Sequence, residues 1–232
     1  MNWISILGDS ICTFEEYNAP GYYIYYNDEI QKENGISSVS DMWWYKVISY
    51  LNGELCVNNS CAGSMVTGDE LISATNDRRI KDLSTKAHTP DIILVAMGFN
   101  DYGFGKDIAD FEAAYTIMLD KLTVRYPEAE IICGTLAESF VGKRSTSLFP
   151  LTPGNNKLSQ FNEVIRIVCK SRGIRLADIA GRERYETLDG VHPTVVGHTT
   201  IANLWIDCLK SEGLSPLLSY SSLYCCVEKQ EA

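Results

Sequence analysis

Short apolar runs alternate with longer amphipathic runs along the chain. The short runs, rich in β-branched residues, cover residues 3–7, 55–57, 91–97, 130–134 and 174–176. Several of them lack alternating polar positions, which is typical of strands in a parallel sheet covered on both faces. We therefore expect five buried strands.

Between these runs, apolar residues recur at spacings of three and four, the period of a helix with one buried face. The expected helices cover residues 41–51, 107–126, 155–172 and 193–210. Ser40 or Asp41 is expected to cap the first helix, Gly173 to end the third and Pro193 to open the last. This alternation predicts an α/β fold, a three-layer α/β/α sandwich with a doubly wound, flavodoxin-like parallel sheet of five strands. Because no linker or repeat interrupts it, we expect a single domain over residues 1–232.

Two segments do not fit the alternation. Residues 13–40 are rich in turns and contain five tyrosines: Tyr17, Tyr22, Tyr23, Tyr25 and Tyr26. Residues 136–154 contain Phe140, Phe149, Pro150 and Pro153. Loops of this length in a compact domain are usually functional or disordered, and their aromatic content argues against disorder.

Composition narrows the class of protein. The chain has 232 residues, of which 45% are hydrophobic and 22% charged, as in an average globular protein. Its formal net charge of −10 argues against nucleic acid or an anionic membrane as a partner, because both attract clustered Lys and Arg. No apolar run approaches the roughly 20 residues that span a bilayer, and the first residues lack the features of a signal peptide. We expect a soluble cytoplasmic protein without membrane insertion.

The eight cysteines form no CxxC pair, and the three histidines give no zinc-binding spacing with them. Most lie within apolar stretches, where small thiols pack as hydrophobic residues. The sequence therefore predicts reduced, mostly buried cysteines, no metal site and no cofactor. The adjacent Cys225 and Cys226 are expected to belong to a plain C-terminal tail.

A serine stands where an α/β sheet places its ligands. Ser10 follows the first strand in Gly8-Asp9-Ser10, and ligands of such sheets bind beyond the carboxyl ends of the strands. A serine hydroxyl needs a base to become a nucleophile. His192 is the best candidate, since Asp189, three residues earlier, can hold its Nδ1–H.

The other two histidines suit structural positions. His88 precedes a strand and so belongs at the opposite end of the sheet, whereas His198 lies inside the last helix, where capping or packing is expected. Taken singly, a Gly-Asp-Ser turn or a DxxH spacing also occurs without any catalytic role.

Two further blocks make the combination more specific. Residues 58–63 (Asn-Asn-Ser-Cys-Ala-Gly) follow the second strand, and Gly98-Phe99-Asn100-Asp101 follow the third. Acyl transfer requires hydrogen-bond donors aimed at the oxyanion of a tetrahedral intermediate. A glycine lets a backbone N–H approach closely, and an asparagine amide supplies a side-chain donor. Four loops thus offer, in order, a nucleophile, two sets of donors and an acid–base pair.

With these four blocks in this order, the chain resembles the SGNH, or GDSL-type, hydrolases. The resemblance covers most of the chain and implies the three-layer α/β/α fold and ester hydrolysis. It implies Ser10 as nucleophile, His192 as base and Asp189 as the orienting acid. The oxyanion hole would consist of the backbone N–H groups of Ser10 and Gly63 and the side chain of Asn100. We find no departure from the family pattern at these positions.

The substrate is less constrained, because this family includes lipases, thioesterases, lysophospholipases and carbohydrate deacetylases. The aromatic segment favours a short-chain (acetyl) esterase acting on a small-molecule ester, with an acetylated sugar as one candidate, although the same tyrosines can simply pack on one another. Of Trp43 and Trp44, one is expected to face the core and the other the site. The candidate substrate-binding side chains are Tyr22, Tyr23, Trp43, Phe99 and Tyr102.

Four alternatives remain open at this stage. One is a thioesterase or a lysophospholipase-type lipolytic enzyme. Another is a non-catalytic, flavodoxin-like binding module, which would hold phosphate on glycine-rich loops; the chain has no GxGxxG or P-loop pattern. A third is a non-catalytic interaction protein on a hydrolase scaffold, against which the intact Ser-His-Asp set argues. The last is a metal-dependent hydrolase, although His192 and His198 are six residues apart, which is not the spacing of a helical zinc pair.

Overall fold

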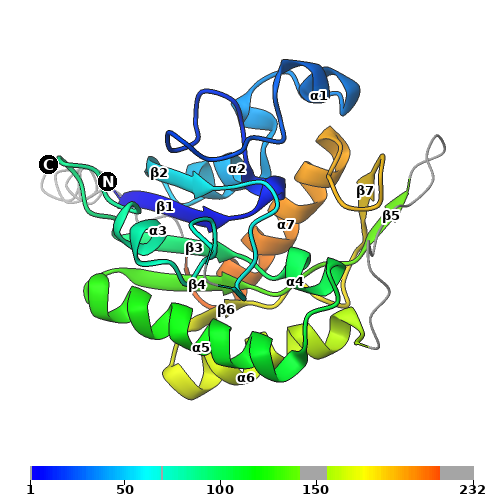
Figure 1. Ribbon diagram of the computed structural model, residues 1–232. Helices are drawn as coiled ribbons and strands as arrows, with labels where there is room; N and C mark the ends of the chain where they lie inside the picture. Colours follow the sequence, from blue (N-terminus) through cyan, green and yellow to red (C-terminus); the bar gives the residue numbers. More distant parts are fainter. Residues whose placement is uncertain (1, 69, 142–155, 215–232) are drawn as a thin grey trace, which may run out of the picture.

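A computed structural model describes residues 2–68, 70–141 and 156–214 and contains one central sheet of five parallel strands (Figure 1). The strand order is β2-β1-β3-β4-β6. The bounds are β1 Asn2–Gly8, β2 Gly53–Ser60, β3 Ile92–Ala96, β4 Glu130–Gly134 and β6 Arg175–Ala177. The order reverses between β1 and β3, which is the switch point at which doubly wound sheets bind ligands. The predicted five-stranded parallel sheet is confirmed.

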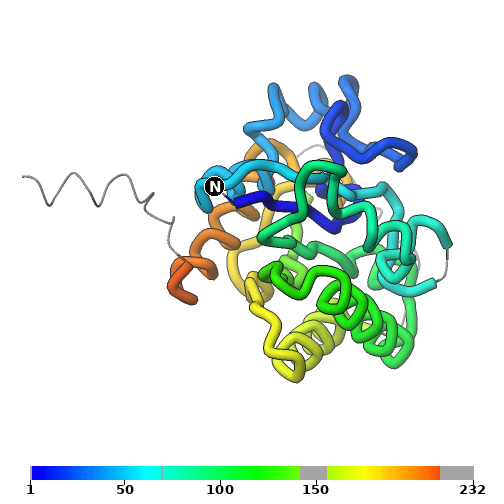
Figure 2. Tube along the Cα trace, turned by 90° about the vertical axis from the view of Figure 1, so that its left-hand side faces the viewer, coloured from blue at the N-terminus to red at the C-terminus, as the bar shows by residue number. Residues whose placement is uncertain are grey.

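Helices cover both faces of this sheet (Figures 1 and 2). On one face, α2 (Trp43–Tyr50) packs against α7 (Val195–Ser211), and on the other α5 (Ile108–Arg125) lies between α3 (Asp77–Lys81) and α6 (Leu158–Arg172). The side chains of α5 that face the sheet are buried at Phe111, Tyr115, Met118, Leu119 and Leu122. Gly173 ends α6 in the left-handed conformation, with φ of 64°, as expected. The three-layer prediction is therefore confirmed.

Two helix starts differ from expectation. Ser40 and Asp41 do not cap α2 but belong to a preceding 3-10 turn, η2 (Val39–Asp41). The Asp41 carboxylate is already engaged, because it accepts hydrogen bonds from the backbone N–H groups of Ser37 and Ser38. The N–H of Trp43 instead donates to Nδ1 of the buried His198, at 3.4 Å, so His198 has the capping role expected of it.

The last helix begins after Pro193 rather than with it. Thr194 is its N-cap, and its hydroxyl accepts a hydrogen bond from the N–H of Gly197. The ring of His88 stacks on Trp3 at the start of β1, far from the carboxyl end of that strand, as its sequence position predicted. Trp43 and Trp44 are both buried, so neither is exposed to solvent at the site.

The two irregular segments contain elements that the sequence pattern did not predict. Residues 13–40 include a short helix, α1 (Asp28–Glu33), and lie outside the sheet at the top of Figure 1. Strand β5 (Ser139–Val141) belongs to the second segment. It pairs with strand β7 (Tyr185–Thr187), which lies further along the chain, in a separate two-stranded parallel sheet. Strands of three residues are too short to give a periodic signal.

Several expectations concern residues outside the described ranges, namely Phe149, Pro150, Pro153, Cys225 and Cys226. The six described cysteines are free thiols, and all but Cys56 are buried. Among the described residues, no helix combines the length and the apolar character needed to cross a membrane.

Candidate active site

The serine lies in a sharp turn at the end of β1. Gly8 ends the strand, and a Cβ at this position would lie 2.6 Å from the Sγ of Cys12, so the turn requires a glycine. Asp9 caps the following 3-10 turn, η1 (Ser10–Cys12), by accepting a hydrogen bond from the N–H of Ile11 at 3.0 Å. Ser10 thereby stands beyond the carboxyl end of β1, next to the switch point of the sheet.

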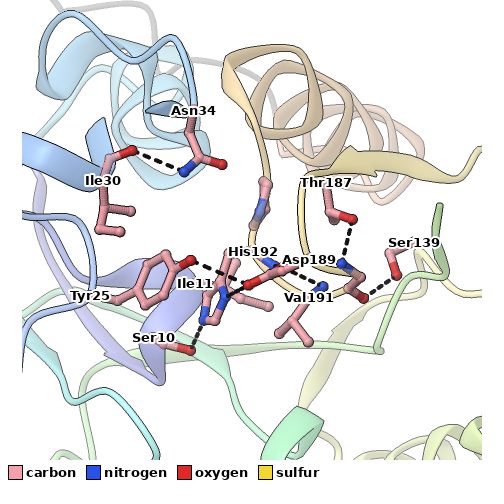
Figure 3. A network of polar contacts seen from close by, with 12 residues as sticks. Ser10, Ile11, Tyr25, Ile30, Asn34, Ser139, Thr187, Asp189, Val191 and His192 are labelled. Atoms are coloured by element: carbon pink, nitrogen blue, oxygen red, sulfur yellow. Dashed lines mark hydrogen bonds and ion pairs between the residues drawn. The ribbon is translucent and has the colours of Figure 1, made fainter. Parts of the chain in front are cut away.

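A chain of hydrogen bonds joins this serine to the turn that precedes α7 (Figure 3). Nε2 of His192 lies 2.9 Å from Oγ of Ser10, and Nδ1 of His192 lies 2.6 Å from Oδ2 of Asp189. In such an arrangement the imidazole can take the serine proton while the carboxylate fixes its tautomer and orientation. The structure thus brings together the three residues that the sequence singled out.

Local hydrogen bonds hold the Asp189 turn in place. Oδ1 of Asp189 accepts the N–H groups of Val191 and His192, at 2.9 and 2.8 Å. The small β5–β7 sheet anchors the turn through Gly190 (Figure 3). The hydroxyl oxygen of Thr187 accepts the N–H of Gly190, and the hydroxyl of Ser139 donates to the carbonyl of Gly190. These bonds connect the Asp189 turn to two elements that the sequence did not reveal.

The charge state of Asp189 suits an orienting acid. Burial of this carboxyl opposes its ionisation, but the hydrogen bond and positive charge of His192, with the two backbone N–H groups, outweigh burial and hold the pKa of Asp189 well below its usual range. Asp189 therefore remains a carboxylate at neutral pH and accepts the Nδ1–H of His192.

The two candidate donor loops are tied to the same edge of the sheet. Gly63 has a φ of 77°, a left-handed conformation that favours glycine. The amide of Asn100 donates one N–H to the carbonyl of Ser64 at 2.8 Å, which leaves its second N–H for another acceptor. The Ser64 hydroxyl in turn donates to the carbonyl of Gly8 at 3.3 Å. The loops after β1, β2 and β3 are therefore linked to one another.

The buried Asp101 reinforces this connection. Its carboxylate accepts the N–H groups of Val66 and Thr67, at 2.8 and 2.9 Å, and so holds the loop after β2 against α4 (Phe99–Gly103). Gly98 precedes α4 with a φ of 122°, and a Cβ there would lie 3.0 Å from the ring of Phe111. The Gly98-Phe99-Asn100-Asp101 block thus combines a tight turn, a potential donor and an anchor.

Asp9 and Arg79 are two buried ionisable side chains close to the Ser10 turn. Burial raises the pKa of Asp9 to about 7, although the hydrogen bond from Ile11 and the positive charge of Arg79 oppose this shift. Burial also lowers the pKa of Arg79 to about 10, which leaves the guanidinium charged at neutral pH. Sequence reasoning missed Arg79, because a surface helix of charged residues gave no signal that one of them points inward.

Two of the candidate substrate-binding residues line a small cavity at the carboxyl end of the sheet. This cavity, of about 50 Å³, lies next to the chain neighbours of Ser10 and is lined mainly by apolar side chains, including Ile11, Trp43, Phe99 and Leu136. A second cavity, of about 340 Å³, is bordered by Phe99, Tyr102 and strand β5.

The other two candidates, Tyr22 and Tyr23, are in the lining of neither cavity. The ring of Tyr22 faces the guanidinium of Arg79 at 5.6 Å, and Tyr23 is 73% exposed. Instead, Tyr25 of the same segment stacks on His192. Sequence reasoning placed Tyr25 in the aromatic segment without singling it out, since no spacing distinguishes it from the other tyrosines.

Within the described residues, no group of three or more His, Cys, Asp or Glu side chains is arranged to hold a metal ion. The polar side chains gathered at the sheet edge are those of a serine, a histidine, an aspartate and an asparagine, a set suited to acyl transfer.

Comparison with known proteins identifies the family. The sequence model of the GDSL-like Lipase/Acylhydrolase family matches residues 2–208. The chain belongs to this family. The fold and family together make it a hydrolytic enzyme of the esterase or lipase type.

Solved structures of GDSL-like enzymes agree with this assignment. A putative GDSL-like lipase from Bacteroides ovatus is 26% identical, with a TM-score of 0.70, over 91% of this chain and 99% of that one. One from Bacteroides uniformis is 27% identical, with a TM-score of 0.65, over 90% and 96%. The carbohydrate acetylesterase Est24 from Sinorhizobium meliloti, at 12% identity, shares the fold, with a TM-score of 0.65 over 92% and 100%. None of the curated proteins compared with the chain matches it.

Proposed function

We propose that this GDSL-family enzyme cleaves carboxylic esters through an acyl-enzyme formed on Ser10, with His192 as general base and Asp189 as orienting acid. The observation that carries the proposal is the unbroken hydrogen-bonded chain, 2.9 Å from Ser10 to His192 and 2.6 Å from His192 to Asp189. A nucleophile within hydrogen-bond reach of a base that is itself oriented by a third group is the arrangement that activates serine.

The reaction follows from this arrangement. Nε2 of His192 takes the Ser10 proton as Oγ bonds to the ester carbonyl carbon, and the carbonyl oxygen becomes an oxyanion. The N–H groups of Ser10 and Gly63 and the free N–H of Asn100 are the proposed donors to it. The alcohol then leaves with the proton from His192. Water attacks the acyl-enzyme by the same route, which releases the acid and returns the proton to Ser10.

The small apolar cavity lined by the chain neighbours of Ser10 supports a short acyl group as the substrate's acid part. Its volume of about 50 Å³ exceeds what one water molecule needs but is far below that of a pocket for a drug-sized ligand. We therefore propose acetyl or similarly short esters as substrates. Two structures of the same fold come from a family two carbohydrate esterase of Clostridium thermocellum and from a carbohydrate acetylesterase, which makes an O-acetylated carbohydrate the first natural substrate to test.

The larger cavity favours a second candidate. Its lining combines apolar side chains, among them Phe140, Val141 and Leu158, with the charged Glu138 and Arg184, and the apolar part is the proposed contact surface for a longer acyl chain. Occupation of this cavity would favour the lipolytic or thioesterase-type activity instead.

Hydrolysis of p-nitrophenyl esters from acetyl to dodecanoyl tests both candidates. We expect activity that is highest on acetyl and abolished in Ser10→Ala, whereas Ser49→Ala, on the exposed face of α2, should behave as wild type. A preference for long chains would replace the short-acyl proposal with the lipolytic one. Activity retained in Ser10→Ala would contradict the serine mechanism itself.

A further inference from the structure

The aromatic segment reaches directly onto the candidate base. The ring of Tyr25 stacks on the imidazole of His192 with a centroid distance of 3.4 Å and an interplanar angle of 11°. Its hydroxyl lies 3.3 Å from Oδ2 of Asp189, the same oxygen that faces Nδ1 of His192 (Figure 3). One side chain therefore touches two members of the Ser10–His192–Asp189 chain.

The backbone of Tyr25 is fixed to the nucleophile's own turn. Its N–H donates to Oγ1 of Thr13 at 2.9 Å, and the Thr13 hydroxyl donates to the carbonyl of Ser10 at 2.9 Å. Two hydrogen bonds thus connect Tyr25, which stacks on the candidate base, to Ser10, from which that base takes its proton.

The next residue fixes the segment to the other half of the site. Tyr26 is fully buried, and its hydroxyl donates to the carbonyl of Pro193, directly after His192, at 2.8 Å. Its ring packs edge-on against both Tyr25 and His192. Tyr25 is therefore hydrogen-bonded to the turn that carries Ser10, and Tyr26 to the turn that carries His192.

The stack has consequences for proton transfer. A ring lying flat on the imidazole prevents it from tilting, so that both nitrogens stay aligned with Ser10 and Asp189. When His192 takes the serine proton it becomes a cation, and the face of an aromatic ring attracts cations. This attraction is stronger in the transition state, in which positive charge develops on the imidazole, than before proton transfer, so it favours the chemical step.

The hydroxyl contributes in a different way. Burial, followed by the negative charge of Asp189, raises the pKa of Tyr25, so the phenol keeps its proton and donates to the carboxylate. At 3.3 Å this bond is longer than the 2.6 Å bond from His192 to the same oxygen. We therefore expect the ring of Tyr25 to contribute more than its hydroxyl to the positioning of His192.

We propose that Tyr25 is a positioning residue of the active site, whose ring holds the His192 imidazole between Ser10 and Asp189 and stabilises the imidazolium that forms during acylation. This inference rests on the proposed serine mechanism. It assigns a function to one residue of the aromatic segment that is independent of the identity of the substrate.

A fluorophosphonate probe tests the proposal without a known substrate, because it forms an Oγ–P bond with an activated serine and releases fluoride. Tyr25→Leu removes the ring, and Tyr25→Phe keeps the ring and removes only the hydroxyl. We expect the maximal labelling rate to fall roughly tenfold in Tyr25→Leu, the scale of a partly buried cation–π contact, with the probe concentration at half-maximal rate unchanged. Tyr25→Phe should stay within about threefold of wild type.

The control and the fold are checked in parallel. Tyr45→Leu changes a tyrosine on the outer face of α2, 37% exposed, and should label as wild type does. Melting temperatures show whether each variant is folded. If Tyr25→Leu does not fold, Tyr25→Met serves as a second variant without the ring.

Each outcome bears on the proposal. A folded ring-less variant that labels at the wild-type rate, or one in which only the half-maximal concentration changes, overturns it. So does a Tyr25→Phe variant as slow as Tyr25→Leu, because the stack would then contribute nothing. Failure of the wild type to label at Ser10 would overturn the serine mechanism as well, which separates the two hypotheses.

Discussion

The buried Arg79 offers the most direct test of how the site is held together. Its guanidinium is inaccessible to solvent and donates four hydrogen bonds. Nε and Nη2 donate to the side chain and carbonyl of Asn59, at 3.0 and 2.7 Å, Nη2 also donates to the carbonyl of Gly8 at 2.9 Å, and Nη1 donates to the carbonyl of Ile72 at 2.6 Å. One side chain therefore joins the last residues of β1 and β2 to the segment before α3.

Arg79→Met keeps the apolar stem of the side chain and removes all four donors. Each buried acceptor left without a partner costs about 1–3 kcal/mol, whereas relief from burying a charged group returns part of that sum. The Gly8 carbonyl keeps the hydroxyl of Ser64, so up to three acceptors lose their partner, and with partial relief we expect the free energy of unfolding to fall by about 3 kcal/mol. Activity should fall too, because Gly8 and Asn59 lead into the serine turn and the Gly63 loop.

Urea denaturation of both proteins measures the loss. The matched control is Arg78→Met, since the neighbouring Arg78 side chain is 62% exposed and pairs with Asp82 four residues further on. Exposed ion pairs contribute at most about 1 kcal/mol, so this variant should be close to wild type. A change below about 1 kcal/mol for Arg79→Met at an unchanged denaturant slope, or an equal change in both variants, would refute the reasoning.

The remaining predictions concern the oxyanion donor, the buried titrating groups and helix packing. Asn100→Ala should lower kcat for an acetyl ester by about 10²–10³ with the circular dichroism spectrum retained, and an unchanged kcat would remove Asn100 from the oxyanion hole. Between the unfolded-chain pKa values of 3.8 for Asp and 6.5 for His, the folded protein keeps a proton on Asp9, whose pKa is about 7, and excludes one from His198, whose pKa is about 3. As the pH falls through this range, Asp9 therefore adds stability and His198 removes it, each by up to about 1.4 kcal/mol per pH unit. Urea denaturation at several pH values should show an acid loss of stability that is steeper than that of wild type for Asp9→Asn and shallower for His198→Gln; identical slopes in all three proteins would contradict both pKa shifts. Gly197→Ala places a Cβ 2.2 Å from the carbonyl of Glu186, so its melting temperature should fall by several degrees, and a wild-type value would show that α7 can move.

The sequence was most informative where residues follow long buried strands. Apolar runs fixed the approximate positions of β1, β2 and β3, and the carboxyl ends of parallel strands necessarily meet at one edge of the sheet. Ser10, Gly63 and Asn100 follow those strands, so their shared location could be predicted from order alone. The pairing of His192 with Asp189 was also predictable, because three residues in a turn are close in space whatever the rest of the fold does.

The sequence was least informative where position depends on contacts between distant segments. The start of α2 was misplaced because Asp41 is engaged by Ser37 and Ser38, and a histidine about 155 residues away supplies the cap instead. The β5–β7 sheet was missed because three-residue strands carry no period. Arg79 looks like any charged residue of a surface helix until β1 and β2 are placed around it.

The same limit explains why Tyr22 and Tyr23 were singled out and Tyr25 was not. Composition indicates that a segment with five tyrosines near Ser10 has a use, but the choice among them depends on the path of the chain. That path is set by Thr13, which holds the Tyr25 N–H, and by the Pro193 carbonyl, which holds the Tyr26 hydroxyl. The two contacts lie on the turns that carry Ser10 and His192. The aromatic segment is therefore built onto the serine and histidine turns themselves, and a change anywhere along it that shifts Tyr25 should alter the rate of acylation before it alters substrate binding.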